Sequence, residues 1–403
     1  MRILLLAPHP FFQSRGTPIA EKLLVAALLA HGHEVEILTF HEGDDPGLPG
    51  CRVHRIPRLP FVRGIRPGFS AKKLLCDAVM LVSCLRLVRS GRYDLLHAVE
   101  ESAFMALVAR RLFDVPYVYD MDSRLPLQMI DKFPPLARLR RGLEGCERLA
   151  VRGSAGVLAV CRSIEEQARE YDPGCLVALL EDVSLLPAER SAGAERLSEL
   201  AGEGPIVLYV GNLEAYQGID LLLEGFARAL RDVPAARLVV IGGAPEAIET
   251  YRQIVARMGM GKNVVFAGPR PVERLGDFLQ QATVLVSPRS QGTNTPMKVY
   301  SYLDSGRPLL ATRLPTHTQV LDDDVACLVE PEPEAVARGL VLLLRSEPLR
   351  RRLAENAREL AQREFTPAAF ERKLLAFYEA VARRIGKGWA PAETPEIALS
   401  SQP

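Results

Sequence analysis

The sequence lacks the features that mark membrane-spanning and disulfide-rich proteins. No apolar run reaches the roughly 18 residues that a membrane-spanning helix needs, and the opening run at residues 3–7 ends at Pro8. A secretory signal needs a longer apolar core and a small-residue cleavage site, so we expect that run to be a buried strand. The seven cysteines form no C-x-x-C pair, which indicates reduced thiols in a cytoplasmic protein.

Several functional classes lack their usual signature. The formal net charge is +1, and no recognition motif accompanies the basic residues, so we expect no nucleic-acid partner. No G-x-G-x-x-G or G-K-[ST] sequence occurs, which argues against a dinucleotide-binding dehydrogenase and a P-loop enzyme. No cluster of carboxylates, histidines or cysteines has metal-binding spacing, so we expect no metal site.

What is present indicates two α/β domains. Strand, helix and strand follow one another at residues 3–7, 20–30 and 34–38, and the same order recurs from residue 206 to 241. That alternation predicts parallel sheets with right-handed crossovers. We expect the other strands at residues 95–97, 117–119, 156–160, 264–266, 283–286, 309–311 and 326–329.

The expected domain organisation follows from this pattern. Residues 1–180 are expected to form an N-terminal Rossmann-like domain, and residues 181–204, which lack an apolar period, a linker. Residues 205–365 form a second Rossmann-like domain. A helix at 366–386 packs back on the first domain, and the proline-containing tail at 387–403 is disordered.

The polar stretch at residues 287–302 is the most informative loop. It starts where a strand ends and enters a helix near Pro296, because proline suits a first helical turn. Its hydroxyl, amide and backbone groups, together with Lys298, suit a diphosphate that bears a sugar. A capped helix entry is the alternative interpretation, but the loop holds more polar groups than a cap requires.

The order of several motifs resembles the family-4 retaining glycosyltransferases over residues 1–380. The first loop with Arg15 and Gly16, followed by the turn at 31–35, is similar to their glycine-rich loop and "GHEV" turn. Residues 210–222 resemble their "VGRL…KGxDLL" segment, and residues 295–308 resemble "P-x-K-x-x-E-x-x-x-x-G-x-P". The resemblance implies the α/β GT-B fold, with two doubly wound Rossmann-like domains facing a central cleft. It also implies that residues 1–180 bind the acceptor and that residues 205–365 bind the nucleotide sugar.

The resemblance also implies an activity, the transfer of a sugar from a nucleotide-sugar donor to an acceptor hydroxyl with retention. The leaving diphosphate is expected to take the acceptor proton, and the nucleotide sugar is a substrate, so no cofactor or metal is required. The chain departs from the family pattern at four donor positions, where neutral side chains replace an arginine, a lysine and two glutamates: Asn212, Gln217, Thr293 and Ser301. Asp122 stands where the family has a catalytic histidine.

These motifs predict the site residues. We expect Asp122 and Lys298 to be catalytic. The predicted donor-binding residues are Gly16, Thr17, Gly211, Asn212, Gln217, Gly243, Arg289, Thr293, Asn294, Thr295, Lys298 and Ser301. Because the departures remove charge, a catalytically inactive scaffold or regulatory protein remains an alternative, as does a nucleotide-sugar epimerase that needs no acceptor. Carboxylates at residues 100–101 and 120–122 either orient an acceptor hydroxyl or cap the following helices.

A basic segment at residues 52–92 suggests a membrane partner. It holds ten arginines and lysines against one acid, Asp77, with apolar residues interleaved. Such a composition favours peripheral contact with the anionic inner face of the cell membrane. It therefore predicts a lipid-linked or glycan acceptor, as in the biosynthesis of an envelope polysaccharide or glycolipid. A solvated basic helix packed on its own domain is the simpler alternative.

Overall fold

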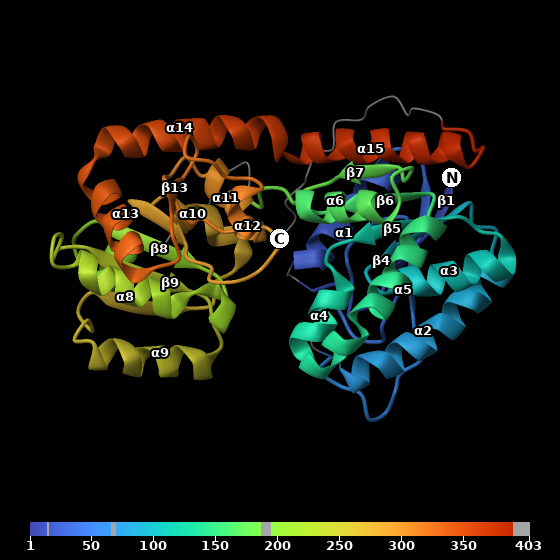
Figure 1. The fold of residues 1–403 in the computed structure, drawn as a ribbon, viewed down its shortest axis with the longest axis horizontal. Coiled ribbons are helices and arrows are strands. Elements are labelled where there is room, and N and C mark those ends of the chain that lie inside the picture. Colours follow the sequence, from blue (N-terminus) through green and yellow to red (C-terminus); the bar gives the residue numbers. More distant parts are fainter. Residues whose placement is uncertain (14–15, 66–69, 187–194, 390–403) are drawn as a thin grey trace. The chain divides into compact units, whose positions relative to one another are not determined.

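The structure is a computed structural model that describes residues 1–13, 16–65, 70–186 and 195–389. The chain divides into two compact units (Figure 1). Unit 1 contains Met1–Glu181 together with the chain from Phe370 onward, and unit 2 contains Asp182–Ala369. Arg15, which belongs to the predicted first loop, lies outside the described residues.

Unit 1 is built on a parallel sheet of seven strands in the order β3-β2-β1-β4-β5-β6-β7. Residues 3–7 of β1 are completely buried, as expected for a strand whose sheet is covered by helices on both faces. The strands are β1 (Arg2–Ala7), β2 (Glu34–Thr39), β3 (Arg52–Arg55), β4 (Leu95–Val99), β5 (Tyr117–Met121), β6 (Gly156–Ala159) and β7 (Val177–Leu179).

The helices of unit 1 connect these strands, and one of them comes from the C-terminal end of the chain. They are α1 (Gly16–Ala30), α2 (Ala71–Ser90), α3 (Ser102–Phe113), α4 (Leu125–Lys132), the 3-10 helix η1 (Pro134–Leu139), α5 (Arg140–Gly153), α6 (Arg162–Tyr171) and α15 (Pro367–Arg384). Unit 1 includes α15 from Phe370 onward, and the first three residues of this helix belong to unit 2.

Unit 2 repeats the doubly wound plan with six parallel strands in the order β10-β9-β8-β11-β12-β13. These are β8 (Ile206–Val210), β9 (Arg237–Ile241), β10 (Val264–Gly268), β11 (Val284–Ser287), β12 (Leu309–Thr312) and β13 (Cys327–Val329). The helices are α7 (Leu197–Ala201), η2 (Ala215–Gln217), α8 (Ile219–Ala229), α9 (Pro245–Arg257), η3 (Val272–Arg274), α10 (Leu275–Leu279), α11 (Met297–Asp304), α12 (Pro315–Thr318), α13 (Pro333–Arg345) and α14 (Glu347–Glu364).

Two strands were not predicted from the sequence, and both lie at the edges of the first sheet. β3 reads Arg-Val-His-Arg, and β7 has only three residues. An edge strand is partly exposed, so it does not need the continuous apolar run that marks a central parallel strand. The basic segment at 52–92 contains the strand β3 and the helix α2, and its residues 66–69, with Arg66, lie outside the described part of the chain.

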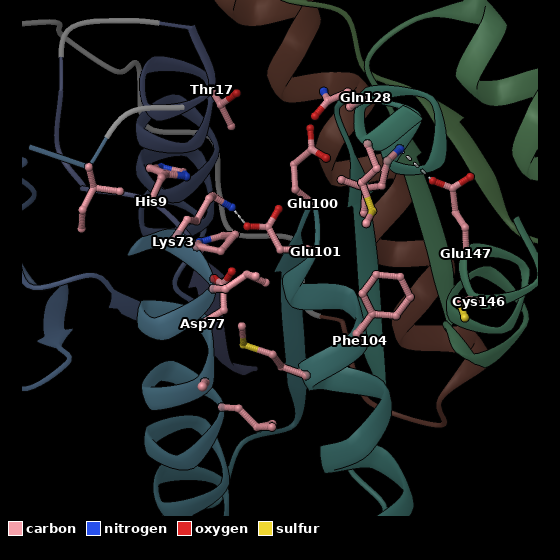
Figure 2. Close-up of a pocket in the computed structure, with 18 of the residues that line it drawn as sticks. His9, Thr17, Lys73, Asp77, Glu100, Glu101, Phe104, Gln128, Cys146 and Glu147 are labelled. Carbon is pink, nitrogen blue, oxygen red and sulfur yellow. Dashed lines mark hydrogen bonds and ion pairs between the residues drawn. The ribbon is translucent and has the colours of Figure 1, made fainter. Parts of the chain in front are cut away.

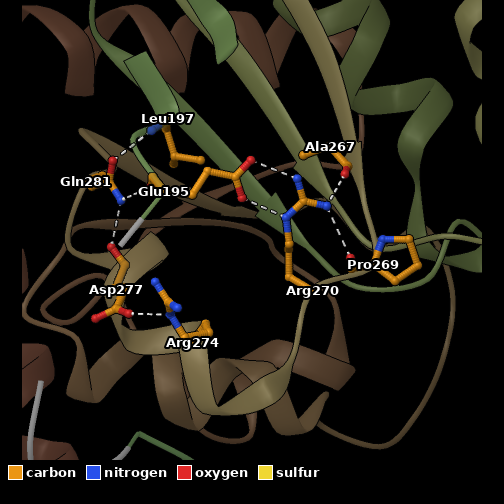
Figure 3. Close-up of polar contacts among 8 residues, drawn as sticks. All are labelled: Glu195, Leu197, Ala267, Pro269, Arg270, Arg274, Asp277 and Gln281. Carbon is orange, nitrogen blue, oxygen red and sulfur yellow. Dashed lines mark hydrogen bonds and ion pairs between the residues drawn. The ribbon is translucent and has the colours of Figure 1, made fainter. Parts of the chain in front are cut away.

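The expected linker at 181–204 packs into unit 2 where the structure describes it. Leu197 is completely buried, and its backbone N–H donates to the side chain of Gln281 at 2.8 Å. Arg270 makes a two-point ion pair with Glu195, at 2.8 and 2.9 Å (Figure 3). The polar composition of this segment thus reflects ion pairs on the surface of a domain rather than a free connection.

The last described residues pack on unit 1. The Tyr378 hydroxyl of α15 lies 2.7 Å from His97 Nδ1, and Lys373 pairs with Glu181 at 3.0 Å. Beyond the helix, Lys387 lies 2.7 Å from Asp94, and the Trp389 ring lies 4.4 Å from the ring of His33. The first residues of the tail that was expected to be disordered are thus held by contacts, and residues 390–403 lie outside the described part. Within the described residues, none of the helices has the length and apolarity to cross a bilayer.

Candidate functional site

Unit 2 has a candidate site at the carboxyl ends of β8, β9 and β11, where the strand order reverses between β8 and β11. Ligands of doubly wound sheets bind at such a switch point. Backbone segments approach one another closely here. A Cβ atom at Gly218 would collide with the Pro288 carbonyl, one at Gly242 with the Gly211 carbonyl, and one at Gly243 with Leu213. These glycines have φ between 73° and 107°, which other residues rarely adopt.

Lys298 is the central cation of this site. It lies in the first turn of α11, its Nζ donates to Gln217 Oε1 at 3.2 Å, and it lies 3.9 Å from the centroid of the Tyr209 ring. Burial, with repulsion from Arg289, holds the pKa of Lys298 well below its ordinary value. A bound anion would therefore stabilise the charged, ammonium form of Lys298.

Arg289 supplies a second cation beside Lys298. Its Nη1 donates to the Asn294 carbonyl at 2.9 Å and to Thr316 Oγ1 at 3.0 Å. Its Nε is buried without a partner, and burial lowers its pKa. Among the described residues, neither Arg289 nor Lys298 forms a salt bridge with a carboxylate. Two partly buried cations without a carboxylate partner are unusual, because charges removed from water are normally paired, so this arrangement is suited to an anionic ligand.

Other predicted donor residues lie around the two cations. The Thr295 hydroxyl is buried without a partner, and the exposed Thr293 hydroxyl donates to Asn294 Oδ1 at 3.2 Å. Asn212 is exposed just after β8, and its carbonyl accepts from the Tyr209 hydroxyl at 2.6 Å. These groups add hydroxyl and amide donors to the site without adding negative charge.

Ser301 has a different environment from the one predicted. It is completely buried, and its Oγ accepts the backbone N–H of Leu185 at 3.0 Å. In this structure the hydroxyl therefore holds the chain at the start of unit 2 and has no surface open to a ligand. A contact between Ser301 and the ribose stays a prediction.

His317, a buried histidine that is not among the predicted ligands, contacts residues at the base of the polar loop at 287–302. His317 contacts Ser287 Oγ at 2.9 Å and the Thr312 carbonyl at 2.8 Å. Burial lowers its pKa to about 4, so the imidazole is neutral at physiological pH. The polar loop thus has a rigid support, and His317 is a packing residue.

Unit 1 contains a separate cavity of about 870 Å³. That volume is in the range of small-molecule sites. Apolar side chains make up much of its wall, and they come from the loop before α2 and from α2, α3, α4 and α5: Ile65, Leu74, Ala78, Leu81, Phe104, Met105, Val108, Leu125, Pro126, Met129 and Leu143. Gly16 and Thr17, which were predicted to bind the donor, also line this cavity of unit 1, and their contact with the donor stays a prediction.

Charged side chains gather in the same cavity (Figure 2). Lys73 forms a close ion pair with Glu101, so one of the cations of the basic segment is not a free surface charge. Asp77, the one acid of that segment, has its pKa raised to about 6 by burial. Glu147 is completely buried, and burial raises its pKa to about 7. The cavity therefore combines apolar walls with a predominantly acidic region.

Glu100 is the residue of this region that lies at a strand end. It follows β4 with φ of 51°, and its backbone N–H donates to the Asp120 carbonyl at 2.9 Å. Its carboxylate accepts from Ser123 Oγ at 2.8 Å, and burial raises its pKa. A left-handed conformation is uncommon for a residue other than glycine, and here it turns the Glu100 side chain into the cavity wall.

The predicted catalytic residue Asp122 follows β5 two positions after Asp120 and is not among the residues that line the cavity. Sequence reasoning did not find the buried pairs near it. His97 Nε2 lies 3.0 Å from Asp120, and His9 lies 3.1 Å from the buried Glu21. Glu21, an acid within the buried apolar face of α1, is the sequence feature that could have indicated the second pair. Among the described residues, His, Cys, Asp and Glu form no group of three or more able to hold a metal.

Comparisons with known proteins agree with this architecture. Two family models match the chain, "Glycosyl transferase 4-like domain" over residues 22–174 and "Glycosyl transferases group 1" over residues 195–360. The D-inositol 3-phosphate glycosyltransferase of Xylanimonas cellulosilytica is 27% identical over 384 residues, which cover 90% of this chain and 91% of that protein.

Solved structures match over nearly the whole chain. Sucrose-phosphate synthase from Thermosynechococcus elongatus has a TM-score of 0.75 at 21% identity, covering 95% of this chain and 100% of that one. The Anabaena protein HepE, solved with UDP, has a TM-score of 0.72 at 14% identity, covering 94% and 100%. With a glycosyltransferase model on each unit and the expected fold throughout, the chain belongs to the GT-B glycosyltransferases of the family-4 type.

Proposed function

We propose that this glycosyltransferase moves a sugar, with retention, from a nucleotide-sugar donor held by unit 2 to an acceptor hydroxyl held by unit 1. The observation that carries the proposal is a pair of partly buried cations at the switch point of unit 2, Lys298 and Arg289, which form no salt bridge with a carboxylate of the described residues. A diphosphate would supply the missing negative charge. The complex of HepE with UDP supports testing a uridine nucleotide first.

In the proposed mechanism the protein mainly stabilises the leaving group. As the sugar–phosphate bond breaks, negative charge grows on the diphosphate, and preorganised cations stabilise that charge more than the charge of the ground state. A phosphate oxygen then takes the acceptor proton. We propose that Asp122, next to the Ser123 that donates to Glu100 in the wall of the unit 1 cavity, helps to orient the acceptor hydroxyl. Lys298 and Arg289 supply the charge compensation, and we propose that neither a metal nor a cofactor is needed.

The neutral residues at the family's usual phosphate positions fit this scheme. Gln217 contacts Lys298 and so positions the remaining cation instead of binding phosphate itself. The loss of a cation weakens binding when nothing replaces it, because a charged hydrogen bond contributes about 1.5–3 kcal/mol. Arg289, tied to the Asn294 carbonyl, is the replacement that we propose.

A ligand screen followed by turnover tests the donor proposal. Thermal-shift measurements with UDP, GDP, ADP and their sugars should give a rise in melting temperature for one base, and NMR of the product should show retained anomeric configuration. If no nucleotide raises the melting temperature, the donor site is wrongly placed. Binding without turnover across an acceptor panel would favour a scaffold, and isomerisation of the donor alone would favour an epimerase.

We also propose that unit 1 contacts the inner face of the cell membrane from the cytoplasm. The exposed face of α2 carries Leu75 and Val82, which are 49% and 46% exposed, and then Arg86 and Arg89 toward its end. Apolar groups followed by cations are typical of surfaces that lie at an anionic bilayer. Arg55 does not contribute, because its guanidinium donates to the Glu42 and Asp44 carbonyls at 2.8 Å.

Vesicle co-sedimentation tests the membrane contact. Each surface cation is worth about 1 kcal/mol at an anionic membrane, so the double variant Arg86→Gln, Arg89→Gln should bind phosphatidylglycerol vesicles roughly 30-fold less tightly. The matched control changes Arg352 and Arg358 to Gln, since both are exposed in α14 of unit 2. Equal binding of both double variants, or no binding by the unchanged protein, would remove the membrane proposal.

The acceptor class needs a separate argument. The Xylanimonas relative is named for D-inositol 3-phosphate, so an inositol phosphate is one candidate acceptor. The proposed membrane contact instead favours a lipid-linked or envelope glycan acceptor. The cavity in unit 1 distinguishes between these two chemistries.

A further inference from the structure

We infer that the cavity in unit 1 binds an uncharged acceptor that carries a hydrocarbon group, with the acceptor's hydroxyls near Glu100 and its hydrocarbon between α2, α3 and α4. The inference rests on the proposed function, because it names the acceptor class of that same transferase. Its basis is the division of the cavity wall into an apolar region and an acidic region.

The cavity is large enough to hold a hydrocarbon chain, and much of its wall is apolar. Leu81, Phe104, Met105 and Met129 come from three different helices and line one cavity of about 870 Å³. A polar ligand there would lose its hydrogen bonds to water without replacement, which is costly. A hydrocarbon gains free energy with each methylene that leaves water.

The cavity also has an apolar opening. Leu74 and Val108 line it and are still 48% and 39% exposed. Leu75 and Val82, exposed on the same helix as Leu74, continue this apolar surface outward. A chain longer than the cavity would therefore leave along the surface that we propose to contact the membrane. The apolar cavity and the exposed apolar surface of α2 are formed by different residues, and both suit the same amphiphilic ligand.

The acidic region argues against a phosphorylated acceptor. Asp77, Glu100, Glu101 and Glu147 line the cavity, and Lys73, the one lysine among the described lining residues, is paired with Glu101. Within that described lining, a phosphate would meet carboxylates of like charge and no unpaired lysine or arginine. A sugar or glycerol hydroxyl donates to a carboxylate instead.

The side chains are arranged to receive such a hydroxyl group. In Figure 2 the carboxylate of Glu100 shares its part of the cavity with Gln128 and Thr17, while Phe104 lies on α3. Ser123 fixes the Glu100 carboxylate through one oxygen, and each carboxylate oxygen can accept more than one hydrogen bond. Glu100 can thus orient a hydroxyl at the mouth of the apolar region.

Calorimetric titration of the full-length protein tests the inference with n-octyl β-D-glucoside below its micelle concentration. Octyl glucoside should bind roughly 15-fold more tightly than hexyl glucoside, because each buried methylene contributes about fourfold. Glucose and D-inositol 3-phosphate should show no binding to this cavity. The variant Ala78→Trp fills the cavity from an exposed position of α2 and should abolish glucoside binding.

The control variant Ala137→Trp makes the same change at an exposed position of η1 outside the cavity and should bind like the unchanged protein. Equal glucoside affinity of the two tryptophan variants, the absence of a chain-length effect, or tighter binding of D-inositol 3-phosphate than of octyl glucoside would each overturn the inference. A UDP thermal shift in the same samples separates the outcomes. A retained shift without glucoside binding rejects only the acceptor class, whereas the absence of a shift with every nucleotide rejects the proposed function.

Discussion

Replacing Lys298 by methionine should raise the stability of the ligand-free protein while weakening nucleotide binding. The burial of Lys298 and its repulsion from Arg289 lower its pKa in the folded state. A base with a lowered folded-state pKa binds fewer protons when folded, so it destabilises the fold at every pH below its unfolded value. Methionine keeps the length of the side chain and removes that cost.

The size of the binding effect follows from the contact that is lost. A charge-assisted hydrogen bond of about 1.5–3 kcal/mol corresponds to a roughly 13- to 160-fold loss of affinity. A nucleotide present at about 100 times its dissociation constant stabilises the unchanged protein by about 2.7 kcal/mol. The same concentration should stabilise Lys298→Met by only about 0.3–1.3 kcal/mol. A domain of this size shifts by about 2–4 °C per kcal/mol, which thermal-shift assays resolve.

The assay compares melting temperatures with and without nucleotide for three proteins. Lys262→Met is the matched control, because Lys262 is an exposed lysine of unit 2 and its loss should change neither value. A variant at Lys298 that melts earlier without ligand, yet keeps the full nucleotide shift, would refute the reasoning at both steps. It would mean that the ammonium group serves the fold and does not meet the diphosphate.

Three further changes test the structure. The pKa of Glu147 is raised to about 7, so its carboxyl costs stability as pH rises from about 4.5 toward 7, by up to about 1.4 kcal/mol per pH unit. In Glu147→Gln this decrease of the free energy of unfolding with pH should be absent from urea denaturation measured across that pH range. The same pH dependence in the variant and the unchanged protein would contradict the prediction. Tyr378→Phe leaves the His97 Nδ1 without its partner and should cost about 1–3 kcal/mol in urea unfolding; an unchanged midpoint would argue against α15 as a structural part of unit 1. Leu197→Ala removes a completely buried side chain and should cost about 2–5 kcal/mol, whereas a free linker would tolerate it.

The sequence predicted the central strands of both sheets and the polar loop at 287–302. Those strands are largely apolar because helices cover both faces, and a local pattern of that kind is visible in sequence. It did not predict β3 or β7, which are edge strands: β3 has polar side chains, and β7 has only three residues. It also treated 181–204 as a linker, because ion pairs such as Glu195 with Arg270 join residues that are far apart in the chain.

The sequence likewise indicated some of the candidate site residues, whereas others became evident only in the structure. Lys298 and Arg289 lie in one contiguous loop and helix, so their spacing along the chain already indicated an anion site. Lys73 was counted as a surface cation, and only its ion pair with Glu101 moved it into the cavity wall.

The amino-acid sequence alone determined the doubly wound plan of both units and the resemblance to family-4 glycosyltransferases, because strand periodicity and motif order are properties of neighbouring residues. Only the tertiary structure decided that α2, α3, α4 and α5 enclose an apolar cavity, and that Asp77, Glu100 and Glu147 gather in its wall. These groups come from separate crossover connections. Their meeting depends on how the helices pack against the sheet, and no pattern within a single segment records it.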